Sequence, residues 1–471
     1  MGQINDYAQL GGIWKDVWGN SVFDPFKFLT PIITDMPLED PLSEAGGIMH
    51  VPIQTTQEAG ITHATPRSTP GYGTATFVAP NAGQVPQMQI EGAQIFGRSL
   101  VTYESMMRSL KDFSGDEESA KKAVKGASKQ VMNSLGRALA KRGEVLALNG
   151  GLPEGLGTIE TIGTTPVGTT YNGVAGFYND VSISFGTWAQ AIFAMAEGAT
   201  FDIYNGTTKV NSGANTALSG GGGPAQTGLI LIGINPAAPV SPLTTTGRVL
   251  RFFHTINGAT GITSLQVNNS IFYETGGPAQ TGIIGSEPLG LSYLLSIGTT
   301  GFPSAIYGLD TATNNVLAGN AITGMGNAKI GAIIENLATP IDYGLVGQTI
   351  RAYVPTRLFQ LLSVDEASMR RYNGEAKKAK NGFSQLEYNM GGNNVLEVMG
   401  HPFQKQGRIT SCVPDECHRV GPQDVSFLTR KGGNYVLEVA AGAASEMRAG
   451  GQYNMYVDSA KHGFVGTGVT Y

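Results

Sequence analysis

Two cysteines and a histidine stand close together near the C-terminus, at Cys412, Cys417 and His418. Thiolates and imidazoles are ligands that zinc prefers, but a zinc site needs four of them, usually in two close pairs. The chain has 2 cysteines in all, and His401 is the one other histidine nearby, so the second pair is missing. The spacing therefore predicts two free thiols in a loop and no metal site.

The glycine-rich segment GGGGPAQTG at 220–228 suggests a phosphate-binding loop by composition. It lacks the Lys-Ser/Thr pair that would hold the phosphates and the metal ion, so we expect no bound nucleotide. Neither an H-E-x-x-H nor a G-x-S-x-G motif occurs. The carboxylate pair Asp365–Glu366 is better explained as the solvated start of a helix. We predict no catalytic residue and no cofactor, and we do not expect an enzyme.

Composition fits a protein that hides much of its surface in contacts with other chains, and it fits a β-rich globular monomer as well. Charged residues make up 14% of the 471 positions, against about 25% in ordinary soluble domains. The net charge of -5 supplies no strong field for recruiting nucleic acid. The sequence contains no run of about 18 apolar residues, so we predict no membrane span. The first residues lack the apolar core of a signal peptide, so we expect an intracellular chain.

One long helix is predicted over 116–148. This stretch has no proline, and Val124, Val131, Ala138 and Val145 recur every seven residues, which gives one apolar face. Acidic residues at its start favour the positive end of the helix dipole. The segment Asn149-Gly150-Gly151 then predicts its end.

The residue pattern of most of the remaining chain predicts β-structure. Residues 47–100 predict two extended legs joined by a polar tip rich in proline and glycine. Residues 155–345 hold only 13 of the 67 charged residues and contain a near-repeat, GGPAQTGLI at 222–230 and GGPAQTGII at 276–284, which suggests equivalent edges of a small barrel. Further on we expect a strand and a helix that starts near Pro355, a hairpin formed by 396–403 and 407–414, and closing strands.

The order of these segments resembles the major capsid proteins of tailed bacteriophages, which share their fold with encapsulin nanocompartments. The resemblance is carried by MHVPIQTTQEAGIT (49–62), EGAQIFGRSLVTYESMMRS (91–109), RALAKRGEVLALNGGLPEGLGTI (137–159) and the stretch from YVPTRLFQLL to MGHPF (353–403). It covers most of the chain except roughly 190–290. It implies an α+β fold with an N-terminal arm, an extended loop, a long spine helix, and peripheral and axial domains.

Under this resemblance the chain divides into six parts, including an inserted all-β domain. These are the arm (1–46), the extended loop (47–100), the peripheral domain (101–192, with the spine helix 116–148), the inserted β-domain (193–286), the axial domain (287–400) and C-terminal strands of both domains (401–471).

The same resemblance implies a chain that assembles with itself into hexamers and pentamers of an icosahedral head shell around double-stranded DNA. Scaffold, portal and decoration proteins would be further partners, the location would be the virion, and assembly would occur in the host cytoplasm. Exposed aromatic and apolar side chains need a partner surface. The expected inter-subunit contacts are Trp14, Trp18, Phe23, Phe26, Phe28, Tyr72, Phe77 and Val78.

Four lysines, Lys121, Lys122, Lys125 and Lys129, lie on one face of the predicted helix. They would contact packaged DNA non-specifically if that face pointed into a shell, and a solvated helix face explains them as well. Two other functions stay open at this point. A β-rich cell-surface or tail-associated binding protein would explain the Gly/Thr-rich middle but not the long helix, and an encapsulin-like compartment protein would usually be much shorter.

Some shells of the family are cross-linked through a lysine in the extended loop. Residues 47–100 contain no lysine, and their only arginines are Arg67 and Arg98. A guanidinium stays protonated and does not serve as the nucleophile. We therefore expect non-covalent assembly: assembled material boiled in denaturing detergent should give one band near 49.4 kDa, and a ladder that resists reductant would contradict this.

Overall fold

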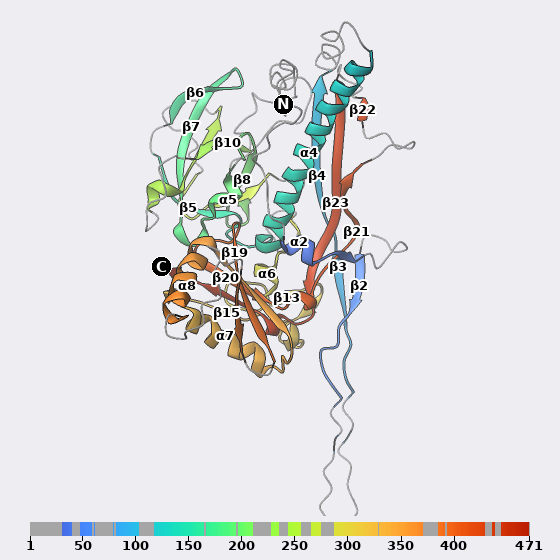
Figure 1. Ribbon diagram of the computed structural model, residues 1–471, viewed down its shortest axis with the longest axis vertical. Coiled ribbons are helices and arrows are strands. Elements are labelled where there is room, and N and C mark those ends of the chain that lie inside the picture. The colour runs from blue at the N-terminus through green and yellow to red at the C-terminus, as the bar shows by residue number, and fades with distance from the viewer. Residues whose placement is uncertain are drawn as a thin grey trace, which may run out of the picture.

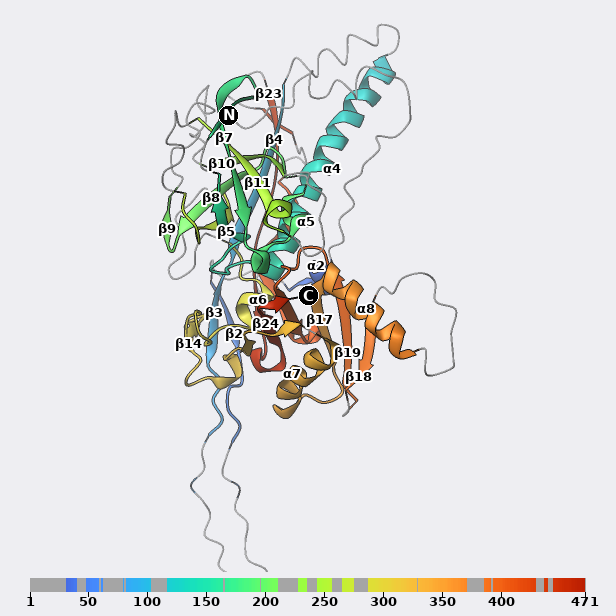
Figure 2. The same cartoon turned by 90° about the vertical axis from the view of Figure 1, so that its left-hand side faces the viewer.

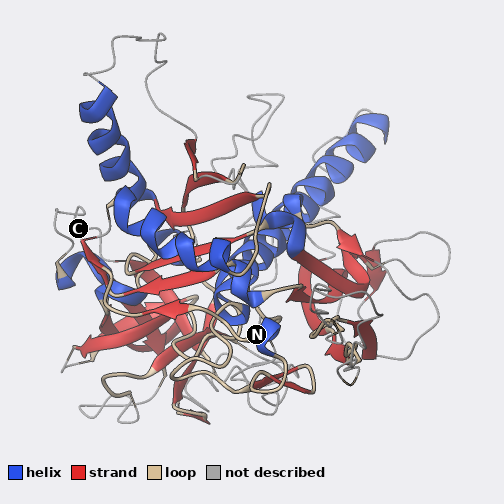
Figure 3. Ribbon diagram, turned by 90° about the horizontal axis from the view of Figure 1, so that it is seen from below, coloured by secondary structure: helices blue, strands red, loops and turns tan. Residues whose placement is uncertain are grey.

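The computed structural model describes residues 31–39, 48–58, 61, 79, 82–102, 117–163, 166–194, 196–210, 228–234, 244–255, 265–274, 287–327, 329–370, 385–390, 393–428, 436–438 and 444–470. The fold is mixed α+β and rich in strands, with three main sheets (Figure 1). Seen from below, the strands form separate groups, and the longer helices extend beyond them (Figure 3). No helix within the described ranges is long and apolar enough to cross a membrane.

The long helix α4 (Glu117–Asn149) confirms the predicted helix over 116–148. Its 33 residues span about 50 Å, beside a five-stranded sheet (Figures 1 and 2). The helix and sheet approach closely at Gly97, where a Cβ atom would lie 2.9 Å from Leu135 Cδ1. The sheet contains β1 (Leu38–Glu39), β4 (Ala93–Thr102), β21 (Cys417–Phe427), β22 (Val436–Glu438) and β23 (Ala444–Val457).

The buried face of α4 does not keep the predicted seven-residue period. Val131 and Val145 are buried, but Ala138 is exposed and Leu139 takes its place in the core. A straight α-helix has 3.6 residues per turn, so a strict seven-residue row drifts around the helix by about 20° per repeat. The apolar stripe therefore moves by one position between 131 and 145.

The second sheet has eight strands and closes on itself. Its order is β12-β8-β10-β11-β7-β5, with β6 on β7 and β9 on β8. Backbone hydrogen bonds from Leu156 N to Ile271 O (2.7 Å) and from Ile159 N to Asn269 O (2.9 Å) join its two ends. We call this unit the barrel. Its strands are β5 (Gly157–Ile162), β6 (Val167–Tyr171), β7 (Val174–Ile183), β8 (Thr200–Asn205), β9 (Thr208–Lys209), β10 (Leu229–Ile234), β11 (Val249–His254) and β12 (Ser270–Tyr273).

The barrel has an aromatic core built around Trp188, Phe193, Phe201 and Phe252, all at 0% exposure. Trp188 and Phe193 belong to the short helical segments η1 (Phe185–Thr187, with Trp188 as its C-cap) and α5 (Gln190–Phe193). The barrel begins at Gly157, so it includes strands that the prediction gave to the peripheral domain rather than to the 193–286 insertion. The first repeat copy runs into β10, and the second copy lies outside the described residues.

The third sheet has the order β15-β24-β20-β17-β19-β18. Leu358 and Leu362, four residues apart on one face of α8, pack into its core beside Ile333 and Leu337 of α7. The predicted strand and following helix are confirmed as β17 and α8. The elements are β15 (Ala321–Ile322), α7 (Ile330–Asp342), β17 (Thr349–Pro355), α8 (Thr356–Arg370), β18 (Gln385–Asn389), β19 (Val395–His401), β20 (Arg408–Cys412) and β24 (Phe464–Thr467).

The predicted hairpin of 396–403 with 407–414 is wrong. Strands β19 and β20 form there, but β17 lies between them, parallel to β19 and antiparallel to β20. The remaining short elements are α2 (Pro31–Asp35), β2 (Ile48–Pro52), β3 (Gln87–Glu91), η3 (Thr245–Arg248), α6 (Leu291–Leu294), β13 (Ala305–Ile306), β14 (Leu309–Asp310), η4 (Asn315–Leu317), β16 (Gly326–Asn327), η5 (Pro414–Glu416), η6 (Ala460–His462) and β25 (Val469–Thr470).

Candidate assembly surface and its supporting junction

The two predicted extended legs are confirmed by an antiparallel ribbon. Strands β2 and β3 pair in the register Ile48↔Glu91 to Pro52↔Gln87. Side chains alternate between the two faces, so Met49, Met88 and Ile90 are buried in the core while their neighbours face out. Pairing continues outward through Ile53 N to Pro86 O (3.0 Å). The root of the ribbon is therefore fixed in the body of the protein.

Beyond this root the ribbon leaves the body (Figures 1 and 2). Thr55 N still donates to Gln84 O at 3.0 Å, but the apolar side chains there are open. Ile61 is 81% exposed and Val85 is 60% exposed. A two-stranded ribbon with no layer packed on it is marginally stable in water. Such a ribbon with exposed apolar side chains has the properties of a surface that packs on a partner.

None of the eight predicted contact residues belongs to the part of the chain that the structure describes. Trp14, Trp18, Phe23, Phe26 and Phe28, and the loop-tip residues Tyr72, Phe77 and Val78, lie outside the described residues. Lys121, Lys122, Lys125 and Lys129 fall within α4, but their side chains are outside the description. Their proposed roles remain predictions.

One part of the predicted arm belongs to the body of this chain. Ile32 of α2 is 0% exposed and Met36 is 2% exposed. The fully buried Glu144 carboxylate accepts hydrogen bonds from Ile32 N (3.0 Å) and Ile33 N (3.1 Å). Helix α2 packs on α4 at Gly143, where a Cβ atom would lie 2.9 Å from Ile33 Cδ1. Residues 31–39 of the predicted arm therefore pack on this chain itself.

The Glu144 carboxylate also binds a buried histidine. His401 Nε2 lies 3.0 Å from Glu144 Oε1, and Phe403 N donates to His401 Nδ1 at 3.3 Å. Because Nδ1 accepts a hydrogen bond from the backbone, Nε2 is the nitrogen that donates to the carboxylate. Sequence reasoning missed this site, although an acidic residue inside the apolar run Gly143–Leu148 was a usable signal.

A second clamp holds the end of the same segment. Strand β1 pairs with β21, and Glu39 Oε1 lies 2.8 Å from His418 Nδ1. Asp458 Oδ2 lies 3.1 Å from Nε2 of the same ring. Both nitrogens face carboxylates, so both must donate, and the ring must carry a positive charge. The bond to Asp458 raises the pKa of His418 to about 9, against the effect of burial and with the help of Glu39.

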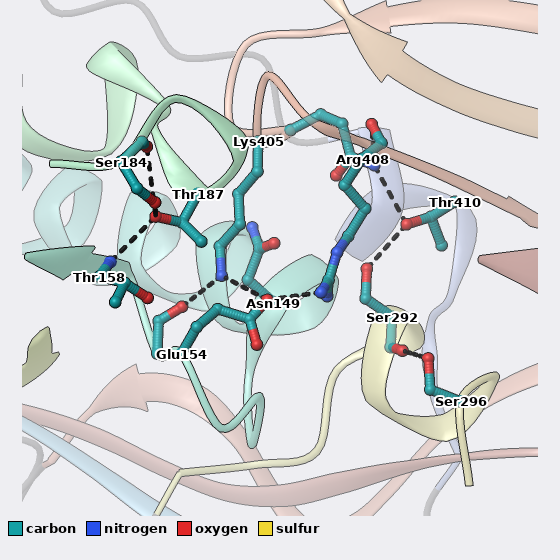
Figure 4. A network of polar contacts seen from close by, with 12 residues as sticks. Asn149, Glu154, Thr158, Ser184, Thr187, Ser292, Ser296, Lys405, Arg408 and Thr410 are labelled. Carbon is teal, nitrogen blue, oxygen red and sulfur yellow. Dashed lines mark hydrogen bonds and ion pairs between the residues drawn. The ribbon is translucent and has the colours of Figure 1, made fainter. Parts of the chain in front are cut away.

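A cluster of charged side chains joins the end of α4, the barrel and the third sheet (Figure 4). Lys405 is 0% exposed, and its Nζ donates to Glu154 Oε1 (3.2 Å) and Gly155 O (2.5 Å). Arg408 Nη2 lies 2.5 Å from the same Glu154 oxygen. Asn149 at the end of α4 donates to Phe403 O at 3.0 Å. We call Glu154, Lys405 and Arg408 the junction cluster.

The two sides of the junction cluster differ electrostatically. Burial would raise the pKa of Glu154, but Arg408 and Lys405 outweigh it and lower the pKa to about 2. Burial lowers the pKa of Lys405 to about 8, and Glu154 only partly opposes this. The negative charge of Glu154 faces two positive charges. Lys405 and Arg408, in contrast, share this one carboxylate. Glu154 is therefore the residue on which the cluster depends.

The two cysteines do not lie in a loop, which corrects that prediction. Cys412 ends β20 and Cys417 begins β21, and both are buried in the same core. The Cys417 thiol donates to Val413 O at 3.2 Å. Its contact with the Cys412 thiol, together with burial, raises the pKa of Cys417, which makes it a poor nucleophile. Among the described residues, no group of three or more His, Cys, Asp or Glu side chains could hold a metal ion.

No protein-family model matches the chain, and no curated protein matches its sequence. Among solved structures, it is similar to the capsid of cyanophage A-1(L), at 9% identity and a TM-score of 0.46, over 97% of this chain and 98% of the other. It is also similar to the capsid of cyanophage P-SCSP1u, at 8% identity and a TM-score of 0.42, over 98% and 94%. The capsid of an empty GTA particle gives 8% identity and a TM-score of 0.42, over 98% of both chains. Each of these three similarities covers nearly the whole of both chains.

Proposed function

We propose that this chain is the major capsid protein of a tailed bacteriophage and that its role is structural. Copies of the chain form hexamers and pentamers and close into the icosahedral head shell around the DNA genome. Shells of this kind repeat one heterologous contact around each ring, so each chain must offer an element that reaches its neighbour. The β2–β3 ribbon is that element.

The ribbon carries the proposal because its two ends have opposite properties. Its root is anchored by Met49, Met88 and Ile90 in the core, so the ribbon is held in a fixed direction. Its outer part exposes Ile61 and Val85 and has no core of its own among the described residues. An anchored root and an uncovered outer part suit an element that gains its packing on the next copy.

The other parts of the chain take further roles in this proposal. The five-stranded sheet with α4 forms the peripheral domain, and the third sheet forms the axial domain near the centre of each ring. The barrel is an insertion between them that serves as a decoration platform or as a further contact between capsomers. Scaffold and portal proteins are the expected assembly partners, and assembly takes place in the host cytoplasm.

Shortening the ribbon tests the proposal. Residues 54–85 are replaced by an Asn-Gly turn, which closes β2 and β3 as a short hairpin. The variant should be soluble and folded but should form no closed shells in negative-stain microscopy, and it should sediment as single chains or small rings. Closed shells at the normal yield would show that the ribbon is not an assembly element.

A matched pair of surface variants separates assembly from solubility. Ile61→Ser with Val85→Ser removes apolar surface from the ribbon, and Val267→Ser removes it from the barrel, where that side chain is 54% exposed. Each exposed substitution should change the free energy of unfolding by less than about 0.5 kcal/mol. Only the ribbon pair should lower the yield of shells. If Val267→Ser lowered the yield of shells equally, the loss would follow from removing any exposed apolar side chain, and the ribbon would have no special role in assembly.

A further inference from the structure

Residues 412–417 carry the chain from the third sheet into the five-stranded sheet. Cys412 is the last residue of β20, and Cys417 is the first residue of β21. Cys412 lies opposite Arg351 of β17, and Cys417 lies opposite Val457 of β23. The two cysteines therefore belong to two different sheets and stand on either side of one short connection.

The turn η5 in this connection brings the two thiols together. Glu416 N donates to Val413 O at 3.1 Å, and the Cys417 thiol donates to the same carbonyl at 3.2 Å. The Cys417 thiol also lies within hydrogen-bonding contact of the Cys412 thiol, and both side chains belong to one core cluster. A disulfide forms between thiols that the backbone already holds close together, and this turn does so.

The two thiols are buried, but only the turn separates them from the surface. Cys412 is 1% exposed and Cys417 is 6% exposed, whereas no residue of η5 is buried. Burial disfavours the reactive thiolate and excludes bulky reagents, so both cysteines stay reduced in the presence of a weak or large oxidant. We expect a reagent close in size to water, such as hydrogen peroxide, to reach them slowly through the turn.

We propose that Cys412 and Cys417 are a redox pair that a peroxide converts into an internal disulfide, which staples the third sheet to the five-stranded sheet. One thiolate attacks a peroxide oxygen, becomes a sulfenic acid and releases hydroxide. The sulfur of the second cysteine then displaces hydroxide from the sulfenic acid, so two thiols and one hydrogen peroxide give one disulfide and two water molecules. Contact between the thiols favours this second step, because the attacking sulfur is already in place.

The occasion for this reaction rests on the proposed function, but the chemistry of the pair does not. Cytoplasm keeps thiols reduced, and oxidising conditions prevail outside the cell. A shell that leaves its host therefore closes the pair after assembly and not before. Because both cysteines lie in one chain, the purified protein tests the reaction whether or not it forms shells.

Treatment of the folded full chain with hydrogen peroxide tests the pair by thiol titration and by intact mass. The wild type should lose both of its free thiols, Cys412 and Cys417. Its mass should fall by about 2 Da, the mass of two hydrogen atoms, and dithiothreitol should reverse both changes. Cys412→Ala and Cys417→Ala should show no such reversible loss of mass. A wild type that keeps both thiols, or that gains oxygen on its cysteines without forming the bond, would overturn the proposal even if a variant failed to fold.

The rate of unfolding in urea tests whether the bond staples the two sheets. The oxidised wild type should unfold more slowly than the reduced chain, because the connection between β20 and β21 can no longer extend. Cys417→Ala should unfold at the same rate with and without peroxide, and this control also corrects for oxidation of methionine. A wild type that forms the bond but unfolds at an unchanged rate would refute the staple.

Discussion

Removal of residues 1–39 is expected to unfold the chain, whereas removal of residues 1–30 should leave it folded. The longer deletion takes Ile32 and Met36 out of the core, at about 1.5–3 kcal/mol each. It also leaves the buried Glu144 carboxylate with His401 as a donor but without its two backbone donors, and a buried polar group that loses hydrogen bonds costs about 1–3 kcal/mol. The total is comparable with the whole stability of a typical domain, about 5–15 kcal/mol.

Soluble yield and the thermal midpoint of the two truncated chains measure this effect. The single substitution Glu144→Ala serves as a control, since it reproduces the loss of the acceptor without removing α2. If the chain without residues 1–39 melts at the wild-type temperature, α2 contributes nothing to the fold. A folded chain without residues 1–30 then allows a clean test of whether Trp14, Trp18 and the three phenylalanines are needed for assembly.

Glu154→Gln is expected to produce the second large effect. The substitution removes the one carboxylate shared by Lys405 and Arg408 and leaves two enclosed cations. Breaking a buried ion pair in this way costs about 3–5 kcal/mol. Lys405→Met should cost less, because burial already disfavours the charge on Lys405 and Arg408 still faces Glu154. Urea unfolding of the three chains at pH 7 gives the comparison.

The contribution of Glu154 also has a definite pH dependence. Its pKa is lowered from the ordinary 4.5 to about 2 in the folded chain. The stabilisation is therefore complete above pH 4.5 and is lost as the pH falls towards 2. The Gln variant should lack this slope. Asp180→Asn is the matched control, because it breaks an ion pair with Arg251 that is 41% and 37% exposed, and it should cost less than about 1 kcal/mol.

Local patterns in the sequence predicted the elements well. The long helix was predicted because its segment has an apolar face and contains no proline. Its end was predicted from Asn149-Gly150-Gly151. The legs of the ribbon and the pair formed by β17 and α8 were also predicted, because each is marked by alternation or by a change of period within a short window.

Contacts between distant segments were not predictable in the same way. Strands β19 and β20 read as a hairpin because they are adjacent in sequence, but β17 pairs with both. Glu144 meets Ile32 across 112 positions and His401 across 257. A single sequence shows which residues are apolar, but it does not show which segments cover a lone charge.

The pairing of β4 with β23 sets a constraint on how the chain folds during synthesis. Residues 93–102 align with 444–453 over their whole length, so β4 has no partner in this sheet until nearly the entire chain has left the ribosome. The β2–β3 ribbon precedes β4 directly in sequence. We therefore expect the ribbon to reach its anchored orientation only after the C-terminal strands have been translated and have closed the sheet.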